Sequence, residues 1–393
     1  MLNSLISLLY SISIFITLNP FFTWSNSWVK VIIYLIPVIF SFVFKKIKSH
    51  QDKDILYYFL ICSSFSIYIY LPIRELDDIN LGFFGMILPL FVLFCSRDIQ
   101  SKTLNHLANI FALISVISLF SLITHSLNVN LWSFNVSQDF RRASSNLEQY
   151  VFFNGSLYLN TLQYKIMNLE LYRMIGWFKE PSHYAIALSF IISFYDFKKK
   201  WMLWVLVFNL FLTFSLSGYI MMIMFYIIKH LDLKGVLKIV FLVILSVILL
   251  SLPALEPVMN TYVWAKVEGK DLLEILFSRA ESTYTIPEIS LYEFMFGFGR
   301  YFTQEFEIII SDFRAAFFRY GLLYFLFIFL HFIQVRFLCF KNYNKYYKVY
   351  ILLMIAIISH RVWIIESIFY MALFILCYIT YGKEVNERKS IGF

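Results

Sequence analysis

Charged side chains are scarce in this sequence. Asp, Glu, Lys and Arg make up 15% of the 393 residues, whereas 60% are hydrophobic and the mean hydropathy is +0.72. A soluble globular domain carries about 25% charged residues, so this chain lacks the polar surface that such a domain needs. The shortage excludes a soluble globular protein and predicts an all-α polytopic membrane protein.

Cysteine is also rare, with four residues in the chain. Cys62 and Cys377 lie within apolar runs, Cys95 ends one, and Cys339 lies in a segment predicted to be cytoplasmic. With none in the predicted outer loops, no disulfide framework is expected. The chain also lacks paired cysteines and a His-x-x-x-His spacing, so we expect no metal and no cofactor.

Long apolar runs are what the sequence has in abundance. Many are long enough to cross the roughly 30 Å of hydrocarbon in a bilayer. The first run has no basic n-region and no small-residue cleavage site, which is typical of a retained helix rather than a signal peptide. We predict one membrane domain, 1-393, with about twelve transmembrane helices near Leu2–Leu18, Trp28–Phe44, Ile55–Ile73, Leu81–Cys95, Leu104–Ile123, His183–Phe197, Trp201–Phe214, Gly218–Ile228, Leu237–Leu252, Ala315–Val335, Val349–Ser359 and Ile364–Tyr381.

The positions of the basic residues predict the orientation of these helices. If the N-terminus is cytoplasmic, the segments on the cytoplasmic side are rich in Lys and Arg, whereas the short loops on the other side hold only Lys30, Arg74 and Arg361. This asymmetry follows the positive-inside rule. It predicts a multi-pass protein of the cell inner (cytoplasmic) membrane with both termini in the cytoplasm. The formal net charge of +8 therefore reflects topology, and no nucleic-acid partner is expected.

Two predicted outer loops are much longer than the other connections, and loops of this length are usually functional. The first covers 124-182 and contains YVFFNGSLYL, in which Asn154-Gly155 between alternating apolar residues indicates a type I′ hairpin near 151-160. The second covers 253-313. Its pattern predicts a helix over Thr261–Ser282 and then a glycine-marked turn, FGFGRYF.

The stretch LYRMIGWFKEPSHY joins the first long loop to the sixth predicted helix. Pro181 suits the first turn of a helix, and the macrodipole favours Glu180 beside that N-terminus. One interpretation is therefore a helix start with a capping acid and with Arg173 and Lys179 as interfacial anchors. The other is a charged cluster, including His183, placed where an anionic lipid headgroup lies.

Further arginines favour the second interpretation. Arg300 follows Gly297-Phe298-Gly299, whose glycines let backbone approach a ligand closely. Ionisable groups inside an apolar run, as at Arg319, tend to face a protein interior or a cavity. Guanidinium groups match phosphate oxygens bidentately. Together with Arg314, and with Asp312 beside it, these residues predict a site for a lipid-linked phosphate or diphosphate at the outer face.

These motifs resemble a known family. RMIGWFKEPSHYA is similar to the Arg-x-x-Gly-x-Phe-x-Glu-Pro-Ser-x-x-Ala pattern of Wzy-type O-antigen and polysaccharide repeat-unit polymerases. FSLSGYI, with Ser215, Ser217 and Gly218, resembles the family's Ser-x-Ser-x-Gly element. FGFGRY and RYGLLYF resemble its Gly-x-Gly and terminal Gly-Leu-Leu elements. Two large outer loops among about a dozen helices also match that architecture.

The resemblance implies a metal-independent glycosyltransferase that uses undecaprenyl-diphosphate-linked oligosaccharides as donor and acceptor. A growing chain would leave its lipid diphosphate, with inversion, and pass to a sugar hydroxyl of an incoming unit. On this hypothesis Arg173, Arg300 and Arg314 bind diphosphate and Arg319 supports them. Glu180 is the leading general base, or instead orients Arg173, while the other candidate bases are His183 and Asp312. Gly176, Pro181, Gly297 and Gly299 shape the motifs; membrane lipids and a chain-length regulator protein are the further partners.

Alternative functions remain open. An O-antigen ligase has a similar architecture with a Ser-His-Asn element, but the comparable place here reads Ser311-Asp312-Phe313. Another lipid-phosphate-sugar glycosyltransferase would use acids in an early outer loop, such as Asp77-Asp78. A flippase would need a charged central cavity, for which His331 and Glu366 are the main candidates within predicted helices. Outer-loop aromatic residues, namely Trp177, Tyr158 and Tyr284, are candidates for stacking on sugars or for packing.

Overall fold

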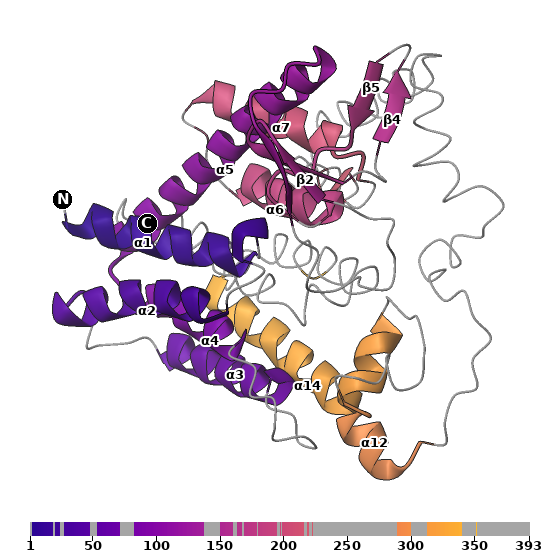
Figure 1. Ribbon diagram of the computed structural model, residues 1–393. Coiled ribbons are helices and arrows are strands. Elements are labelled where there is room, and N and C mark those ends of the chain that lie inside the picture. Colours follow the sequence, from indigo (N-terminus) through magenta and orange to yellow (C-terminus); the bar gives the residue numbers. More distant parts are fainter. Residues whose placement is uncertain are drawn as a thin grey trace, which may run out of the picture. The chain divides into compact units, whose positions relative to one another are not determined.

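The computed structural model describes a mostly helical chain (Figure 1). The described residues are 2–18, 20–23, 27–47, 53–70, 82–136, 150–159, 163–166, 169–178, 180–194, 197, 199–215, 218–219, 222, 289–299, 313–339 and 351. The chain divides into two compact units. Unit 1 consists of Met1–Leu18, Ser27–Leu104 and Asp271–Phe393, and unit 2 of Asn19–Asn26 and Asn105–Lys270.

Unit 1 is built from helices that pack side by side. Its elements are α1 (Leu2–Thr17), α2 (Ser27–Val43), α3 (Lys53–Tyr70), α4 (Gly82–Ile87), the 3-10 helix η2 (Leu88–Phe94), the start of α5 (Arg97–Ser126), α12 (Leu291–Phe296) and α14 (Phe313–Cys339). Helix α2 packs on α1, and α3 packs on α4 and α14. Aromatic pairs join α3 to α14: Phe65 contacts Tyr324, and Tyr58 contacts His331. Because the earlier residue of α3 meets the later residue of α14, these two helices run antiparallel.

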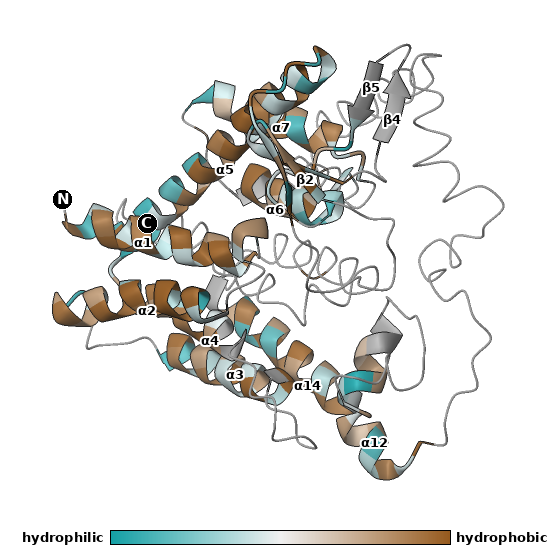
Figure 2. Cartoon of the chain, viewed as in Figure 1, coloured by the Kyte–Doolittle hydropathy of each residue, from teal (hydrophilic) through white to brown (hydrophobic). Residues whose placement is uncertain are grey.

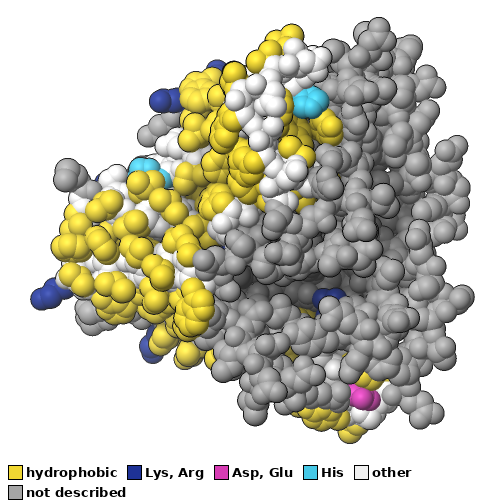
Figure 3. Space-filling view, in the orientation of Figure 1, with side chains coloured by type: hydrophobic (Ala, Val, Ile, Leu, Met, Phe, Trp, Pro, Cys, Tyr) yellow, Lys and Arg dark blue, Asp and Glu magenta, His cyan; other side chains and the backbone are white. Residues whose placement is uncertain are grey.

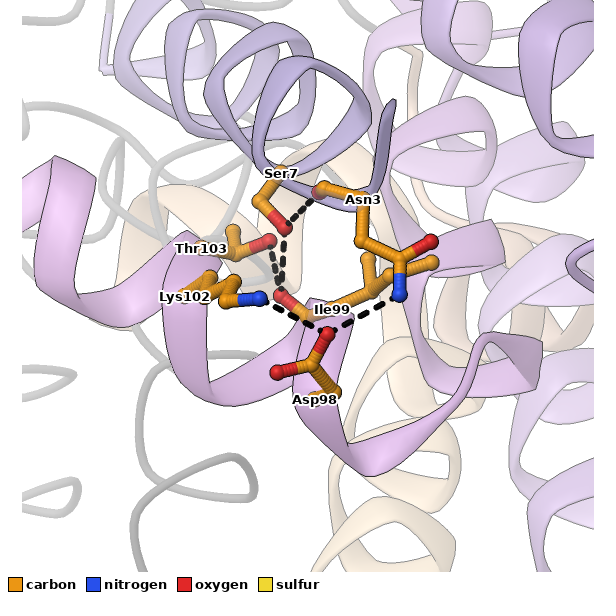
Figure 4. A network of polar contacts seen from close by, with 6 residues as sticks. All are labelled: Asn3, Ser7, Asp98, Ile99, Lys102 and Thr103. Atoms are coloured by element: carbon orange, nitrogen blue, oxygen red, sulfur yellow. Dashed lines mark hydrogen bonds and ion pairs between the residues drawn. The ribbon is translucent and has the colours of Figure 1, made fainter. Parts of the chain in front are cut away.

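Small polar residues hold α1 against the start of α5 (Figure 4). Ser7 Oγ donates to Ile99 O at 3.1 Å, and Ser11 Oγ donates to Thr103 O at 2.7 Å. The step of four residues is the same in both helices, so α1 and the start of α5 run parallel. Serine at a helix interface allows the backbones to approach closely, and its hydroxyl bonds to carbonyls across the gap. At the open end of this interface, Asp98 accepts hydrogen bonds from Asn3 and Lys102, each 2.9 Å long.

Unit 2 combines helices with two small sheets. It contains the 3-10 helix η1 (Phe21–Thr23), the rest of α5, β1 (Ser133–Val136), β2 (Tyr150–Phe153), β3 (Ser156–Leu159), β4 (Gln163–Ile166), β5 (Leu169–Tyr172), α6 (Pro181–Phe194) and α7 (Lys200–Leu212). Strands β1-β2-β3 form one antiparallel sheet, and β4-β5 form another. Sequence reasoning predicted only the β2–β3 hairpin. The first long loop is thus richer in strand than expected.

The β2–β3 hairpin turns at Asn154-Gly155, as predicted. Both residues have positive φ, +44° and +100°, which a type I′ turn requires. The Asn154 side chain also ties the hairpin to the end of α5. Its Oδ1 accepts from the backbone N–H groups of Leu131 and Trp132, and its Nδ2 donates to Thr124 Oγ1 at 2.8 Å and to Val129 O at 2.7 Å. This buried asparagine therefore joins the hairpin turn to the end of α5 and to the segment that leads into β1.

Two described helices are long and apolar enough to cross a membrane: α5, and the part of α14 over Ala316–Phe337. Figure 2 shows the predominantly hydrophobic helices, and Figure 3 shows hydrophobic side chains covering the surface over α1 and α2. On α2 the exposed side chains include Trp28, Ile32 and Ile39, spaced as on one helix face. Exposed apolar surface of this extent marks an interaction site, such as a membrane.

The remaining predicted helices are matched to differing degrees. The fourth consists of the short α4 followed by the 3-10 helix η2, with Pro89 near its start, so it is not one α-helix as expected. The tenth, α14, is broken at Gly321. The predicted helices at 237–252 and 364–381, and almost all of those at 218–228 and 349–359, lie outside the described residues. About twelve transmembrane helices, the topology and the domain boundaries therefore stay predictions.

Candidate functional site

The segment between β5 and α6 contains most of the first predicted motif. Arg173 follows β5 directly, and α6 begins at Pro181, so the proline occupies the first helical position as expected. Gly176 lies at the turn between them, with φ +59°. We call residues 173–183 the first turn.

The guanidinium of Arg173 caps the C-terminal end of α7. Its Nε donates to Thr213 O at 3.0 Å and its Nη2 donates to Phe214 O at 2.7 Å. The neighbouring Met174 N donates to Leu212 O at 3.0 Å. The last carbonyls of a helix have no intrahelical partner and form the negative end of its dipole, so a buried arginine there is stabilising. This geometry supports a structural role for Arg173, and its predicted role on diphosphate stays a prediction.

Gly176 lets the first turn pack tightly. A Cβ at this position would lie 3.2 Å from the ring of Tyr184, and the positive φ disfavours any other residue. Its carbonyl accepts from Leu157 N at 2.9 Å, and Trp177 Nε1 donates to Gly155 O at 2.7 Å. The first turn is thus fixed against the β2–β3 hairpin, and Trp177 packs within the unit rather than projecting from it.

Glu180 and His183 lie at the N-terminal end of α6. Glu180 O accepts from the backbone N–H groups of His183 at 3.1 Å and of Tyr184 at 3.4 Å, as an N-cap residue does. Its carboxylate accepts from Ser182 Oγ at 3.3 Å. Both Glu180 and His183 are partly exposed. The capping interpretation is therefore supported, while proton transfer by either residue stays a prediction.

A buried polar cluster lies beneath this helix start. Tyr184 Oη and Ser115 Oγ are 2.7 Å apart, and Asn209 lies 3.4 Å from the same phenol. Asn209 Nδ2 also donates to Ser115 O at 3.1 Å. Sequence reasoning missed this cluster, which joins α5, α6 and α7. The only local signal was a polar residue inside each of three apolar runs.

Gly218, in the stretch FSLSGYI, packs against α6. Ser189 Oγ donates to Gly218 O at 3.1 Å, and a Cβ at Gly218 would lie 2.6 Å from the Ala185 Cβ. Glycine is therefore needed for close approach of the two segments. Ser215 is buried in this turn. Ser217 falls outside the part that the structure describes.

In unit 1, the FGFG turn contacts the start of α14. Helix α12 begins with a capping box formed by Ser290 and Glu293, and Gly297 is its C-cap. Phe298 N then donates to Phe318 O at 2.7 Å, and Gly299 N donates to Arg319 O at 3.0 Å. We call this contact between 297–299 and 318–321 the second turn. It joins two of the sequence elements on which the family resemblance rests.

A break in α14 makes this contact possible. Gly321 has φ +64° and ψ −162°, which are not helical. A Cβ at Gly321 would lie 2.5 Å from the Met295 carbonyl, and one at Gly297 would lie 2.4 Å from the Arg319 carbonyl. The break removes the intrahelical partners of the carbonyls before it. Phe298 and Gly299 bond to two of them, and the Tyr68 hydroxyl of α3 donates to Tyr320 O. Sequence reasoning predicted no role for Tyr68.

The remaining predicted residues are placed as follows. Arg319 lies at the second turn and is partly exposed. Arg314 lies within α14. Asp312, Arg300, Asp77, Asp78, Tyr284 and Glu366 lie outside the described residues. The structure therefore brings together Arg173, Gly176, Pro181, Glu180 and His183 in one unit, and Gly297, Gly299 and Arg319 in the other.

Two aromatic or titratable candidates are buried. Tyr158 is 2% exposed and donates to Ser121 Oγ at 2.9 Å, so it packs in the core and does not offer a face to a sugar. Burial raises the pKa of its phenol further above physiological pH. His331 is also buried, against Tyr58. Within the described ranges, no group of three or more His, Cys, Asp or Glu residues could hold a metal ion.

Fold and site together define a mostly helical chain with apolar helices suited to a membrane and two glycine-containing turns that carry arginines. No protein-family profile matches the chain, and neither a curated protein nor a solved structure is significantly similar to it.

Proposed function

We propose that the chain is a polysaccharide polymerase of the inner membrane that joins undecaprenyl-diphosphate-linked oligosaccharide repeat units by inverting glycosyl transfer. The observation that carries this proposal is the second turn. Two motif elements about twenty residues apart, FGFG and RYGLL, contact each other through the backbone beside Arg319. Convergence of motif elements on one point supports a shared role for them.

The reaction has two chemical requirements that the protein must meet. The departing diphosphate must be stabilised, which guanidinium groups do through paired hydrogen bonds. The acceptor hydroxyl must lose a proton to a positioned base. We assign diphosphate binding to Arg319 with Arg300 and Arg314, and proton transfer to Glu180. His183 and Asp312 are the other candidate bases. Arg173 then acts mainly by holding the first turn in place.

The packing directions support the predicted topology. Helix α1 and the start of α5 run parallel, while α3 and α14 run antiparallel. In the predicted topology the first and fifth helices both begin in the cytoplasm, and the third and tenth cross in opposite directions. The second turn then lies at the outer end of α14, where a lipid diphosphate on the outer face is accessible.

The test is the surface polysaccharide of a strain that lacks this chain. Wild-type complementation is expected to give a ladder of chain lengths, and the empty deletion to give single repeat units on the lipid carrier or on the acceptor. A ladder from the empty deletion would contradict the proposal. Single units stranded on the inner leaflet would instead indicate a flippase, and free polymer not joined to its acceptor would indicate a ligase.

A further inference from the structure

Six aromatic side chains of unit 2 form a continuous set of ring contacts. Phe21 contacts Phe22 and Phe152, and Phe22 contacts Trp177. Phe152 in turn contacts Trp132 and Phe134, with ring centroids 5.3 and 5.0 Å apart. We call this set, Phe21, Phe22, Trp132, Phe134, Phe152 and Trp177, the aromatic platform. It connects η1, strands β1 and β2, and the first turn.

The platform is buried on one side and open on the other. Phe152 is 5% exposed, whereas Trp132 is 53% exposed and Phe134 is 47% exposed. The neighbouring Leu127 and Leu131 are exposed as well. From Leu127 to Val136 the sequence contains no Lys, Arg, Asp or Glu. The exposed hydrophobic side chains of this segment therefore form an apolar surface beside exposed Asn128, Asn130, Ser133 and Asn135, and none of the residues in 127–136 is charged.

This surface continues directly from a helix that is suited to a bilayer. From Thr103 to Ser126, α5 has no Lys, Arg, Asp or Glu. At a rise of 1.5 Å per residue this stretch measures roughly 36 Å, slightly more than the hydrocarbon thickness of about 30 Å. Its exposed hydrophobic side chains, Leu113, Val116, Phe120 and Ile123, fall on one helix face, and exposed Asn105 and Asn109 lie toward its other end. Leu127, just after α5, is exposed as well. If lipid covers that face, the last turn of α5 reaches the interface.

The structure fixes the platform to this end of α5. The Asn154 side chain bonds to Thr124 Oγ1 and Val129 O on one side, and to the N–H groups of Leu131 and Trp132 on the other. Four hydrogen bonds from one buried side chain leave little freedom between helix and strand. Trp132 therefore stays close to the level at which α5 ends.

We propose that the open side of the aromatic platform lies in the interfacial region of the bilayer, in the leaflet where α5 ends. Trp residues are enriched at that depth because one part of the ring is apolar and its N–H is polar. Within the platform, Phe152, Phe21 and Phe22 connect Trp132 to Trp177, so the platform sets the height of the first turn relative to the lipid headgroups. This inference is independent of the proposed reaction and requires only that α5 crosses the membrane.

An oligosaccharide is the other candidate occupant of the open side. A bound sugar needs polar partners for its hydroxyl groups, since hydroxyls left without hydrogen bonds are unfavourable. Residues 127–136 add the aliphatic side chains of Leu127 and Leu131 to the rings and contribute no charged group, which fits acyl chains better than sugar.

The test places nitroxide labels on strand β1 of the full chain in liposomes, after replacement of the four native cysteines by alanine. Phe134→Cys reports the apolar face, and Ser133→Cys is the matched control, because successive strand residues point to opposite faces. We expect collisions with oxygen to dominate at 134 and collisions with a water-soluble nickel chelate to dominate at 133. More frequent collisions with the nickel chelate than with oxygen at both positions would overturn the proposal. So would a label at 134 that loses nickel contact only when repeat-unit oligosaccharide is added.

A second measurement uses the protein with its own cysteines. The fluorescence of Trp132 is the difference between the emission of the native protein and that of the Trp132→Phe variant, and brominated phosphatidylcholine should strongly reduce this difference. A difference that is the same in brominated and unbrominated lipid would overturn the proposal, because Trp132 would then not contact lipid.

Discussion

The first and second turns look alike in sequence, since each combines glycine, arginine and a helix end, yet they are held in different ways. At the first turn a side chain makes the key contacts, because the Arg173 guanidinium caps the carbonyls that end α7. At the second turn the backbone makes them, because Gly299 N and Phe298 N bond to the carbonyls before the break in α14. An arginine side chain beside a helix end therefore bonds to carbonyls in one place, while the other place does not depend on an arginine side chain for these bonds.

The largest effect expected from this comparison is at the glycines of the second turn. Gly297→Ala and Gly321→Ala each place a Cβ within 2.5 Å of backbone atoms at positive φ. We expect each to lower the free energy of unfolding by about 3 kcal/mol or more, because neither backbone can move aside easily. Thermal unfolding in detergent measures the loss.

Gly299→Ala is the matched control for these substitutions. Gly299 also has positive φ, but nothing lies within 4 Å of the position of its Cβ. Only backbone strain is added, for which about 1 kcal/mol is expected. Equal losses at all three glycines would show that the close contact is not what matters.

The next effect is at Arg173. Arg173→Ala removes the donors to two carbonyls and leaves those groups buried, which should lower the free energy of unfolding by about 2 kcal/mol. Arg173→Lys should recover part of this loss, since one ammonium reaches fewer acceptors than the planar guanidinium. An unchanged melting temperature for Arg173→Ala would remove the difference between the two turns.

A smaller effect is expected at Tyr68, whose hydroxyl donates to a carbonyl of α14 just before the break. Tyr68→Phe deletes the donor to Tyr320 O and keeps the ring contact with Phe327. The loss should be about 1 kcal/mol in thermal unfolding. A loss as large as that of Gly321→Ala would mean that side chains, and not backbone, hold the second turn.

The smallest stability change is expected at Glu180, where activity separates two roles. Glu180→Gln keeps an oxygen for Ser182 Oγ but removes the negative charge and the base. As a cap alone, Glu180 should contribute only about 0.5 kcal/mol through the helix dipole, and polymer should still form. As the general base, its substitution should slow chain growth by about 100-fold or more with the same melting temperature. Polymer length distributions together with melting curves distinguish the two.

Local patterns in the sequence predicted the features that local chemistry decides. Asn154-Gly155 predicted a two-residue turn because both positions need positive φ, and Pro181 predicted a helix start because its missing N–H is tolerated there. The apolar runs also predicted most of the described helices. Strands β1, β4 and β5 were missed, since their segments lack a comparable turn signal.

Contacts between distant residues could not be predicted in this way. Arg173 bonds to carbonyls 40 and 41 residues further along the chain, and Tyr68 bonds to one 252 residues away. Nothing in RMIGW indicates that its arginine caps another helix. The local pattern therefore cannot distinguish an arginine that binds phosphate from one that caps a helix. The break in α14 was hidden as well, because a single glycine in an apolar run is often tolerated within a helix.

The most direct test of the proposed function is the polysaccharide profile of a strain that carries Arg319→Ala, measured beside the melting temperature of the purified variant. Arg336→Ala, an exposed change in the last turn of the same helix, is the control. We predict that Arg319→Ala gives single repeat units although the purified variant still unfolds in one cooperative transition above the growth temperature, while Arg336→Ala gives the full ladder. A full-length ladder from Arg319→Ala at normal expression would contradict the assignment of Arg319 to diphosphate.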